Sequence, residues 1–260
     1  LFDEKLALDL GANILGSINE VFINADGYKK SITSPGLGNY ISMAKATAAT
    51  RNVIGEDRLK HRTYIQAHGT GTPQNRATES HILSKVAKSF QIHNWPIAAV
   101  KSYVGHSVST SAGDQMAAAL GVFHHGTIPG ILTINGTIAD DVSQDRLDFL
   151  TEHRSMGSGN IDATIINSKG FGGNNASAFI LSPEETQIKM ESLVTKNKYN
   201  QYLKNVGETR KKSSQYNKSC LKGNYQVTYK FNENVLNGET DIEISRKGIK
   251  LKGFKKPIRF

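Results

Sequence analysis

The stretch YIQAHGTGTPQNRATES (64–80) decides the fold of this chain, because a short apolar run meets a glycine-rich loop there and then a helix. The run from Tyr64 to Ala67 ends at HGTGTP (68–73), which predicts a strand that leads into a loop. From Arg76 to Phe90 apolar residues recur at helical spacing, namely Ile82, Leu83, Val86 and Phe90. This order of strand, loop and helix favours an α/β fold with functional loops at strand ends.

The same order recurs further along the chain. A second apolar run, Ile97 to Val100, ends at the segment KSYVGHS (101–107), and we expect a helix within Ser109–Phe123. Two further strands are expected at 163–166 and 176–181, joined through the turn GFGG (170–173). The region 1–182 is therefore predicted to be one α/β domain.

His68 is the first candidate for chemistry. It follows a predicted strand, so its imidazole can point from the edge of the sheet into a cleft. Gly69 and Gly71 allow a ligand to approach the backbone closely, and the hydroxyls of Thr70 and Thr72 can bond an amide-rich substrate. For a His-Gly pair alone, a hydrogen-bonded structural loop is the competing hypothesis.

Lys101 and His106 are candidates of the same kind, since they follow the next predicted strand. A nearby ammonium disfavours protonation of an imidazole. A neutral imidazole can donate one hydrogen bond to a carbonyl oxygen that is becoming an enolate. A surface lysine and a structural histidine remain the alternative. In GFGGNN (170–175), Phe171 would project from a tight turn, although a plain hairpin turn would have the same sequence.

Three segments in order, HGTGTPQNRATES (68–80), KSYVGHS (101–107) and NSKGFGGNNAS (167–177), resemble the C-terminal half of the β-ketoacyl-acyl carrier protein synthases of the thiolase superfamily. IPGILTIN (128–135) is similar to the linking segment of that family. The resemblance covers residues 1–182. It implies the C-terminal half of a thiolase-like layered αβαβα fold, followed by a basic connector and a small β-rich extension at 183–260.

The resemblance also implies roles for individual residues. His68 and His106 match the two active-site histidines, and Lys101 matches the lysine that supports them. Five residues are expected to bind substrate. Thr70 and Thr72 match hydroxyls that contact the phosphopantetheine arm of the carrier protein. The others are the turn residues Phe171, Gly172 and Gly173, and Phe171 matches a phenylalanine that gates the acyl pocket. Glu79 matches an acidic residue near the lysine.

The activity implied is a decarboxylative condensation of an acyl thioester with malonyl-acyl carrier protein, of the fatty acid or polyketide type. A thiolase-like condensation without decarboxylation is disfavoured, because that branch would have a second cysteine where this chain has glycine and asparagine. The partner expected is the acyl carrier protein, and the cofactor expected is none besides its phosphopantetheine arm. The remaining histidines lack metal-ligand spacing, so no metal is expected.

Cysteine usage conflicts with a complete synthase. In the family a cysteine nucleophile lies in the N-terminal half, whereas Cys220 is the single cysteine here and follows every family motif. Three hypotheses remain: a piece of a longer synthase, a subunit completed by another chain, or a non-catalytic partner like a chain-length factor. For the assembly we expect a homodimer, or pairing with an N-terminal half or a synthase subunit. Because the first residue is Leu1, we expect the chain to begin partway through a longer protein.

Charge and hydropathy limit the other classes of protein. Of the 260 residues 38% are hydrophobic, and no apolar run approaches the roughly 20 residues of a membrane span. The net charge is +9, but residues 1–185 contain 15 Lys and Arg against 17 Asp and Glu. The domain therefore has no basic field for nucleic acid, and neither nucleic acid nor membrane is expected as a partner. A single thiol indicates a reducing, cytoplasmic location.

The basic residues gather in the tail, where residues 186–260 contain 17 Lys and Arg against 6 Asp and Glu. Residues 186–222 are predicted to be a helical or loosely ordered connector. The end of the chain is predicted to form a small β element, because apolar residues alternate with other residues there and a hairpin-type turn stands at Asn237-Gly238. The alternating residues are Val227, Tyr229 and Phe231, then Ile242 and Ile244, and then Ile249 and Leu251. Such a tail could speed the encounter with an acidic carrier protein.

Overall fold

The structure is a computed structural model that describes residues 3–27, 36–227, 231–233 and 235–260. By internal contacts the chain divides into two compact units, residues 1–209 and 210–260. The boundary between them falls inside the last long helix, α8 (Lys196–Leu221).

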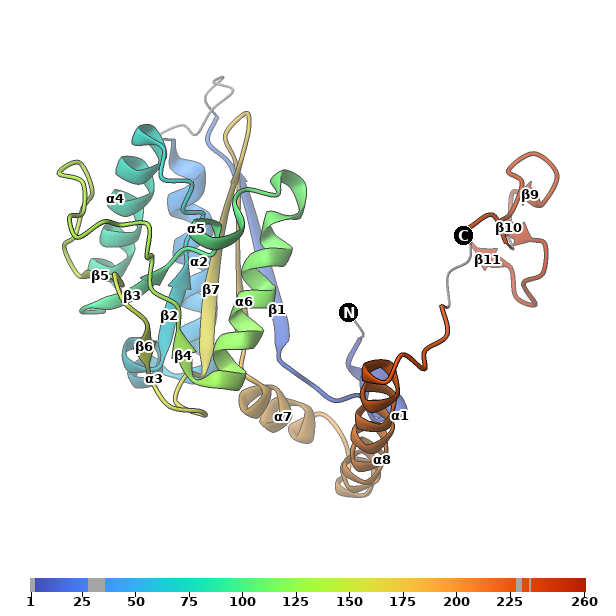
Figure 1. Ribbon diagram of the computed structural model, residues 1–260. Coiled ribbons are helices and arrows are strands. Elements are labelled where there is room, and N and C mark those ends of the chain that lie inside the picture. Colours follow the sequence, from blue (N-terminus) through green and yellow to red (C-terminus); the bar gives the residue numbers. More distant parts are fainter. Residues whose placement is uncertain (1–2, 28–35, 228–230, 234) are drawn as a thin grey trace. The chain divides into compact units, whose positions relative to one another are not determined.

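A six-stranded mixed sheet forms the centre of the first unit (Figure 1). In spatial order its strands are β1 (Ser17–Ala25), β8 (Asn174–Leu181), β7 (Ala163–Gly170), β2 (Thr63–Gln66), β3 (Trp95–Ala98) and β5 (Leu147–Phe149). β7, β2, β3 and β5 run parallel, whereas β8 is antiparallel to both β7 and β1. The loops that follow β2 and β3 therefore leave the sheet at the same edge, where polar side chains from both can meet.

Helices cover both faces of this sheet. On one face lie α2 (Leu37–Ile54) and α4 (Pro73–Ser89), and on the other lies α6 (Ser111–His125) (Figure 1). Neighbouring residues of β2 point to opposite faces, so Ile65 packs in the cluster of α2 and α4 while Tyr64 packs in the cluster of α6. Both side chains are completely buried, as expected for a strand covered on both sides.

Short elements connect the layers. They are α3 (Glu56–His61), α5 (Lys101–Val104), the 3-10 helix η1 (Val108–Thr110), and the two-residue strands β4 (Thr127–Ile128) and β6 (Arg154–Ser155). α5 and η1 belong to the KSYVGHS segment and the residues after it, so this motif leaves the sheet as a compact series of turns.

The α/β class is confirmed, and the strands and helices predicted within residues 1–182 are present. The strand expected up to Ala67 is β2, the run at 97–100 overlaps β3, and the two later strands are β7 and β8. The helix expected from Arg76 begins three residues earlier, at Pro73, because proline is favourable in the first turn of a helix, where its missing N–H leaves no bond unmade.

Neither β1 nor α2 was predicted. β1 is an edge strand that leaves Val21 and Ile23 largely exposed, so its sequence lacks a clear alternation. α2 buries polar side chains, among them Asn39 and Thr47, on the face that a typical helix makes apolar. In both elements the contacts with the rest of the domain decide the secondary structure, and the hydrophobic pattern of the sequence does not show it.

A third cluster joins the start of the chain to its later helices. Ala7 and Leu8 of α1 (Glu4–Leu10) pack against Met190 of α7 (Pro183–Ser192) and against Tyr202 and Val206 of α8. The boundary predicted at 182/183 falls between β8 and α7, whereas the division by contacts falls after Thr209 because of this cluster. The helical alternative for the connector is confirmed by α7 and α8.

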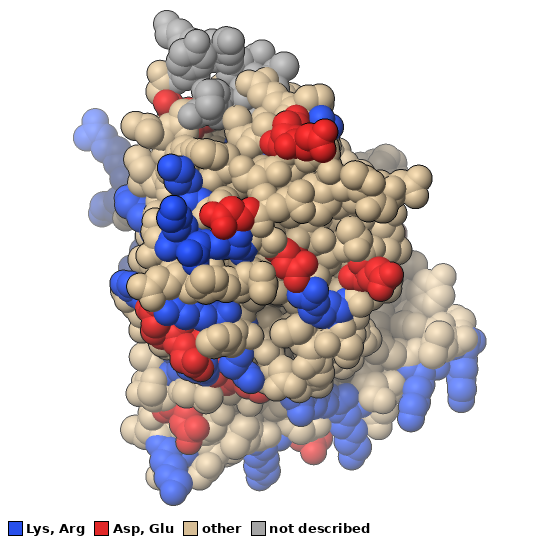
Figure 2. All heavy atoms as spheres, turned by 90° about the vertical axis from the view of Figure 1, so that its left-hand side faces the viewer, with Lys and Arg blue, Asp and Glu red and all other residues tan. Residues whose placement is uncertain are grey.

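Charges of both signs share the surface face drawn in Figure 2, and neither sign covers it. Some of the charges pair, as in the contact of 2.8 Å between Arg76 Nε and Asp141 Oδ1. In the part of the chain that the structure describes, no helix is long and apolar enough to cross a membrane.

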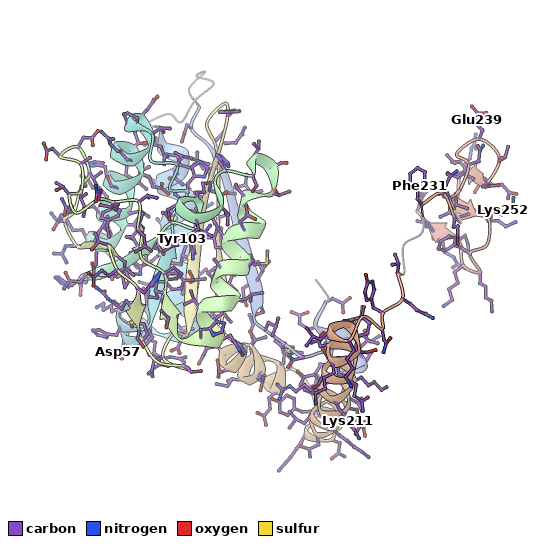
Figure 3. The ribbon with its side chains drawn as sticks, viewed as in Figure 1. Asp57, Tyr103, Lys211, Phe231, Glu239 and Lys252 are labelled. Carbon is purple, nitrogen blue, oxygen red and sulfur yellow. The ribbon has the colours of Figure 1, made fainter. Side chains whose placement is uncertain are left out.

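The second unit contains the end of α8 and a small antiparallel sheet of β9 (Ile242–Ser245), β10 (Gly248–Leu251) and β11 (Ile258–Arg259). Among its described residues only Gly248 is buried, and Phe231, Glu239 and Lys252 are all exposed (Figure 3). The predicted pairs at 242/244 and 249/251 are confirmed as strands.

Two details of the predicted β element were wrong. The hairpin turns at Arg246-Lys247, and the turn at Asn237-Gly238 precedes β9 instead of joining two strands, since the Asn237 N–H and side chain bond to residues of the same loop. Val227 and Phe231 lie outside strands, and Tyr229 lies outside the described residues.

Candidate active site

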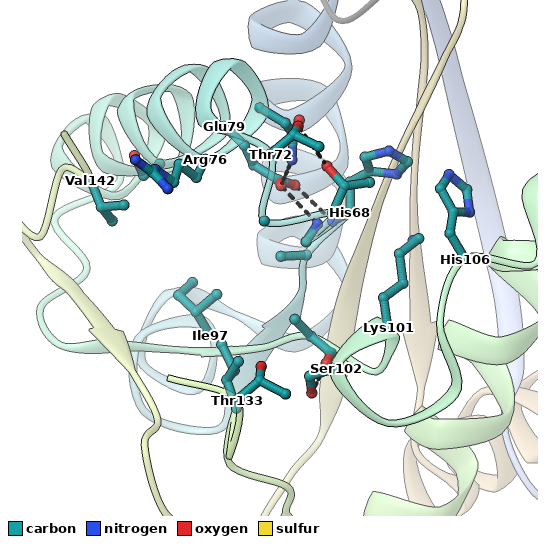
Figure 4. Close-up of a pocket in the computed structure, with 18 of the residues that line it drawn as sticks. His68, Thr72, Arg76, Glu79, Ile97, Lys101, Ser102, His106, Thr133 and Val142 are labelled. Carbon is teal, nitrogen blue, oxygen red and sulfur yellow. Dashed lines mark hydrogen bonds between the residues drawn. The ribbon is translucent and has the colours of Figure 1, made fainter. Parts of the chain in front are cut away.

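Glu79 holds the loop that carries His68. The Glu79 carboxylate, buried on α4, accepts a hydrogen bond from the backbone N–H of His68 at 2.7 Å and from that of Gly69 at 2.9 Å (Figure 4). Side-chain amides of Asn75 and Asn167 donate to the same carboxylate at 3.0 and 2.7 Å. Four donors from three elements thus satisfy a buried carboxylate, which fixes the backbone where β2 ends.

Gly69 is required where it stands. Its φ is +58°, and a Cβ at this position would lie 2.6 Å from the Cβ of Ala99. The loop can therefore pass close to the residues after β3 only with glycine. This close passage places the HGTGTP loop beside the KSYVGHS segment.

The imidazole of His68 is buried, with 3% of its surface exposed. Its Nδ1 accepts a hydrogen bond from the backbone N–H of Lys169 at 3.2 Å, so the proton of the neutral ring lies on Nε2. Burial lowers the pKa of His68 to about 4, and the positive charges of Lys101 and Lys169 add to the shift, whereas Glu79 opposes it. His68 is therefore a neutral hydrogen-bond donor at pH 7.

His106 is held in the same tautomer by its own loop. The backbone N–H of Val108 donates to Nδ1 of His106 at 3.1 Å, which leaves Nε2–H as the donor. Val108 has a φ of +56°, a strained conformation for a β-branched residue, so this loop stores strain next to the imidazole. Burial and the charge of Lys101 lower the pKa of His106.

The two rings lie close together, with centroids 5.3 Å apart and planes at 85° (Figure 4). Lys101 stands beside them on α5, is 8% exposed, and its Nζ has no hydrogen-bond partner among the described residues. Burial lowers the pKa of Lys101, while the carboxylates of Glu79 and Asp114 oppose the shift. One ammonium next to two imidazoles favours the neutral form of both.

These side chains open into a cavity of about 1050 Å³. Six of the eight predicted site residues line it, namely His68, Thr70, Thr72, Lys101, His106 and Phe171, whereas Gly172 and Gly173 do not. The hydroxyls of Thr70 and Thr72 lie 3.3 Å apart on the same wall. Much of the remaining wall is apolar, with Ile97, Ile134 and Val142 among its residues, so the cavity suits an elongated substrate with a polar reacting end.

Phe171 is 77% exposed in the hairpin turn between β7 and β8. Gly172 and Gly173 follow it with φ of +78° and +76°, which makes the turn tight enough to leave the aromatic ring at its apex. The predicted turn between two strands is confirmed.

Comparison with known proteins agrees with this geometry. A family model described as "Beta-ketoacyl synthase, C-terminal domain" matches residues 15–135. Over 259 residues, 99% of its length, the chain is 43% identical to the β-ketoacyl-[acyl-carrier-protein] synthase FabY of Pseudomonas aeruginosa, of which it spans 40%. The crystal structure of that ketosynthase superposes with a TM-score of 0.87 at 42% identity, over 100% of this chain and 40% of that chain.

The chain belongs to the β-ketoacyl synthase family and carries its C-terminal domain. The chain shares its fold with ketosynthase twelve of the bacillaene polyketide synthase of Bacillus amyloliquefaciens, with a TM-score of 0.58 at 21% identity. That superposition covers 68% of this chain and 32% of the other. The thiolase-like fold class is thereby confirmed.

Three buried residues of this synthase domain were missed by sequence reasoning. Asn167 bonds Glu79, Gln115 Nε2 donates to the carbonyl oxygens of Ala67 and Asn167, and Lys169 lines the cavity. Asn167 and Lys169 stand in the NSKGFGG segment, just beyond the strand predicted at 163–166, and the structure extends that strand, β7, to Gly170 and buries both side chains. Gln115 had no signal in the sequence, because its partners are 48 and 52 residues distant. Among the described residues no three His, Cys, Asp or Glu side chains gather as they would around a metal ion.

Proposed function

We propose that this domain stabilises the enolate in a decarboxylative Claisen condensation between an acyl thioester and malonyl-acyl carrier protein. The observation that carries the proposal is the pair of neutral imidazoles, His68 and His106, each with Nδ1 occupied by a backbone N–H and each with Nε2–H as donor. Two donors fixed in this way suit an oxygen that gains negative charge.

The chemistry requires these donors at one step. When the bond between the carboxylate and Cα of the malonyl group breaks, CO₂ leaves and the electron pair forms an enolate on the thioester oxygen. Hydrogen bonds from His68 and His106 stabilise that oxygen without a proton transfer. The enolate carbon then attacks the acyl thioester held on a cysteine, and the cysteine thiolate leaves. Each donor of this kind contributes about 3 kcal/mol to such a barrier.

The cysteine is proposed to lie outside residues 1–260. Cys220 stands near the end of α8 in the second unit and does not line the cavity. Cys220 is the single cysteine of the sequence, so residues 1–260 offer no other thiol for the acyl-transfer step. A segment or subunit that brings a thiolate to the cavity would complete the acyl-transfer step.

The carrier's phosphopantetheine arm is proposed to enter along Thr70 and Thr72, whose hydroxyls can bond its amides. Phe171 at the exposed apex of the β7–β8 turn would separate the acyl part of the cavity from the reacting end. Both roles agree with a cavity that is polar at the histidines and apolar beyond them.

The test is CO₂ release from malonyl-acyl carrier protein by the natural full-length protein. His68→Ala and His106→Ala are each expected to lower the rate by about 100-fold or more while the fold is retained. His61→Ala, on the exposed face of α3, is the matched control and should leave the rate unchanged. A rate near that of the wild type in either site variant would reject the proposal.

The same experiment separates the second candidate, a non-catalytic partner of another synthase. That candidate predicts no CO₂ release and no acyl adduct on the protein alone, with activity only in the presence of a catalytic subunit. Retention of both histidines and Lys101 around an open cavity favours the catalytic proposal.

A further inference from the structure

Lys169 is a second buried lysine at the cavity, and the proposed mechanism does not use it. It is 7% exposed, lines the cavity beside His68, and its Nζ has no hydrogen-bond partner among the residues that the structure describes. An ammonium sealed from water without a partner is costly, so such a group is normally paired or meets a ligand.

The neighbouring carboxylates do not supply that partner. Glu79 already accepts four N–H donors, and Asp26 accepts from Asn175 at 2.9 Å through Oδ1. The other oxygen of Asp26, Oδ2, is itself buried without a partner in the described part of the chain, so it does not bond Lys169. Burial lowers the pKa of Lys169, and the charges of Glu79 and Asp26 oppose that shift. The reacting end of the cavity therefore holds a lysine whose Nζ has no partner among the described residues.

The position of Lys169 relates it to the reacting atoms. Its own backbone N–H bonds Nδ1 of His68, so the lysine stem starts one hydrogen bond from the imidazole that is proposed to hold the thioester oxygen. In a malonyl thioester the carboxylate is separated from that oxygen by only three carbon–carbon and carbon–oxygen bonds. The flexible four-carbon stem lets Nζ turn toward an anion in the cavity that it lines.

We propose that Lys169 is a specificity-determining residue that binds the free carboxylate of the malonyl group, so that the site selects a carboxylated thioester over an acetyl thioester. This inference rests on the proposed function. The contact is made in the ground state and is lost as the carboxylate becomes neutral CO₂. It therefore contributes to the affinity for the malonyl substrate and not to the rate of the chemical step.

The experiment compares malonyl- and acetyl-pantetheine thioesters, which differ by one carboxylate, on the natural full-length protein. Lys169→Met is expected to raise KM for the malonyl thioester about tenfold or more, with kcat equal to or above that of the wild type. The inhibition constant of the acetyl thioester should stay within about twofold. Lys169→Arg, which retains the charge, should recover most of the malonyl affinity.

Lys88→Met is the matched control, since Lys88 is exposed on α4 and away from the cavity lining. Equal losses for both thioesters, or a fall in kcat at unchanged KM, would overturn the inference. Thermal unfolding of each variant identifies a loss that comes from misfolding, in which case Lys169→Arg decides.

Failure of the proposed function is read from different data. If the wild type releases no CO₂, the proposed function is wrong, and calorimetric binding of the two thioesters to the wild type and Lys169→Met then tests the carboxylate contact alone. Tenfold weaker binding of only the malonyl thioester would still support the contact, and equal binding would reject it.

Discussion

Oε1 of Glu79 lies 2.7 Å from the backbone nitrogen of His68, and Oε2 lies 2.9 Å from that of Gly69. One carboxylate on a helix thus holds two successive peptide groups at the end of a strand. The position of the imidazole in the cavity depends on this clamp, because the backbone from which it projects has no freedom to turn.

Glu79→Gln should break the clamp. A glutamine amide has one acceptor oxygen, and its NH₂ group would face a backbone N–H that also needs an acceptor. We expect a loss of about 2 to 4 kcal/mol in the free energy of unfolding, measured by urea denaturation, and a parallel loss of CO₂ release. Glu20→Gln, on the exposed edge strand β1, is the control and should change neither. Unchanged stability of Glu79→Gln would contradict the clamp.

The acid stability of the protein should depend on His68. Its pKa is about 4 in the folded state and near 6.5 when unfolded, so between these values the unfolded state binds more protons. Stability is therefore lost as the pH falls from about 6.5 to 4, by on the order of 3 kcal/mol from this group. Urea denaturation at several pH values, compared with His68→Gln, measures the difference, which should vanish above pH 7.

The rate of CO₂ release should follow the same direction. Both imidazoles must be neutral, so that Nδ1 accepts from the backbone and Nε2–H is an uncharged donor. Because the pKa of each histidine is lowered, the fall of the rate on the acid side of the pH–rate profile, its acid limb, should lie below pH 6.5. Lys101→Met removes a charge that lowers both pKa values and should move this limb to higher pH. A limb that stays in place would show that Lys101 does not act through the histidines.

Two glycines of the same loop provide a matched steric test. In Gly69→Ala the new methyl group would meet Ala99 at 2.6 Å, in addition to the strain of a positive φ. In Gly71→Ala the φ of +69° is similar, but nothing lies within 4 Å. We expect Gly71→Ala to cost about 1 to 2 kcal/mol of stability and Gly69→Ala distinctly more. Equal costs would mean that backbone strain alone requires glycine in this loop.

Shortening the natural protein tests the domain boundary. Removal of residues 210–260 should leave the melting temperature within about 3 °C, since the described part of this unit buries only Gly248. Removal of residues 183–260 would also remove α7 and α8 and so expose Leu8, which packs against them. Because the burial of Leu8 contributes about 2 kcal/mol to stability, the melting temperature should fall by about 4 °C or more. Equal melting temperatures would support the boundary predicted at 182/183.

The sequence by itself determined the α/β alternation, the family and the chemical residues of the cavity. The HGTGTP and KSYVGHS loops follow buried strands, and a strand that ends in a polar loop has a local pattern that a sequence shows directly. The turn that carries Phe171 was also predicted, because the glycines of GFGG permit a tight turn between two apolar strands.

Only the tertiary structure decided how those residues act. The donor to Nδ1 of His68 stands 101 residues away in the sequence, and the carboxylate of Glu79 reaches back 11 residues to the backbone of His68, which no local pattern contains. The burial of the Lys169 ammonium without a partner among the described residues is likewise visible only in the fold. The lowered pKa of His68 also follows from the burial of its side chain in the folded domain. The sequence therefore named the histidines, while the folded structure determined the burial of His68, the tautomer of both rings and the lysine that stands beside them.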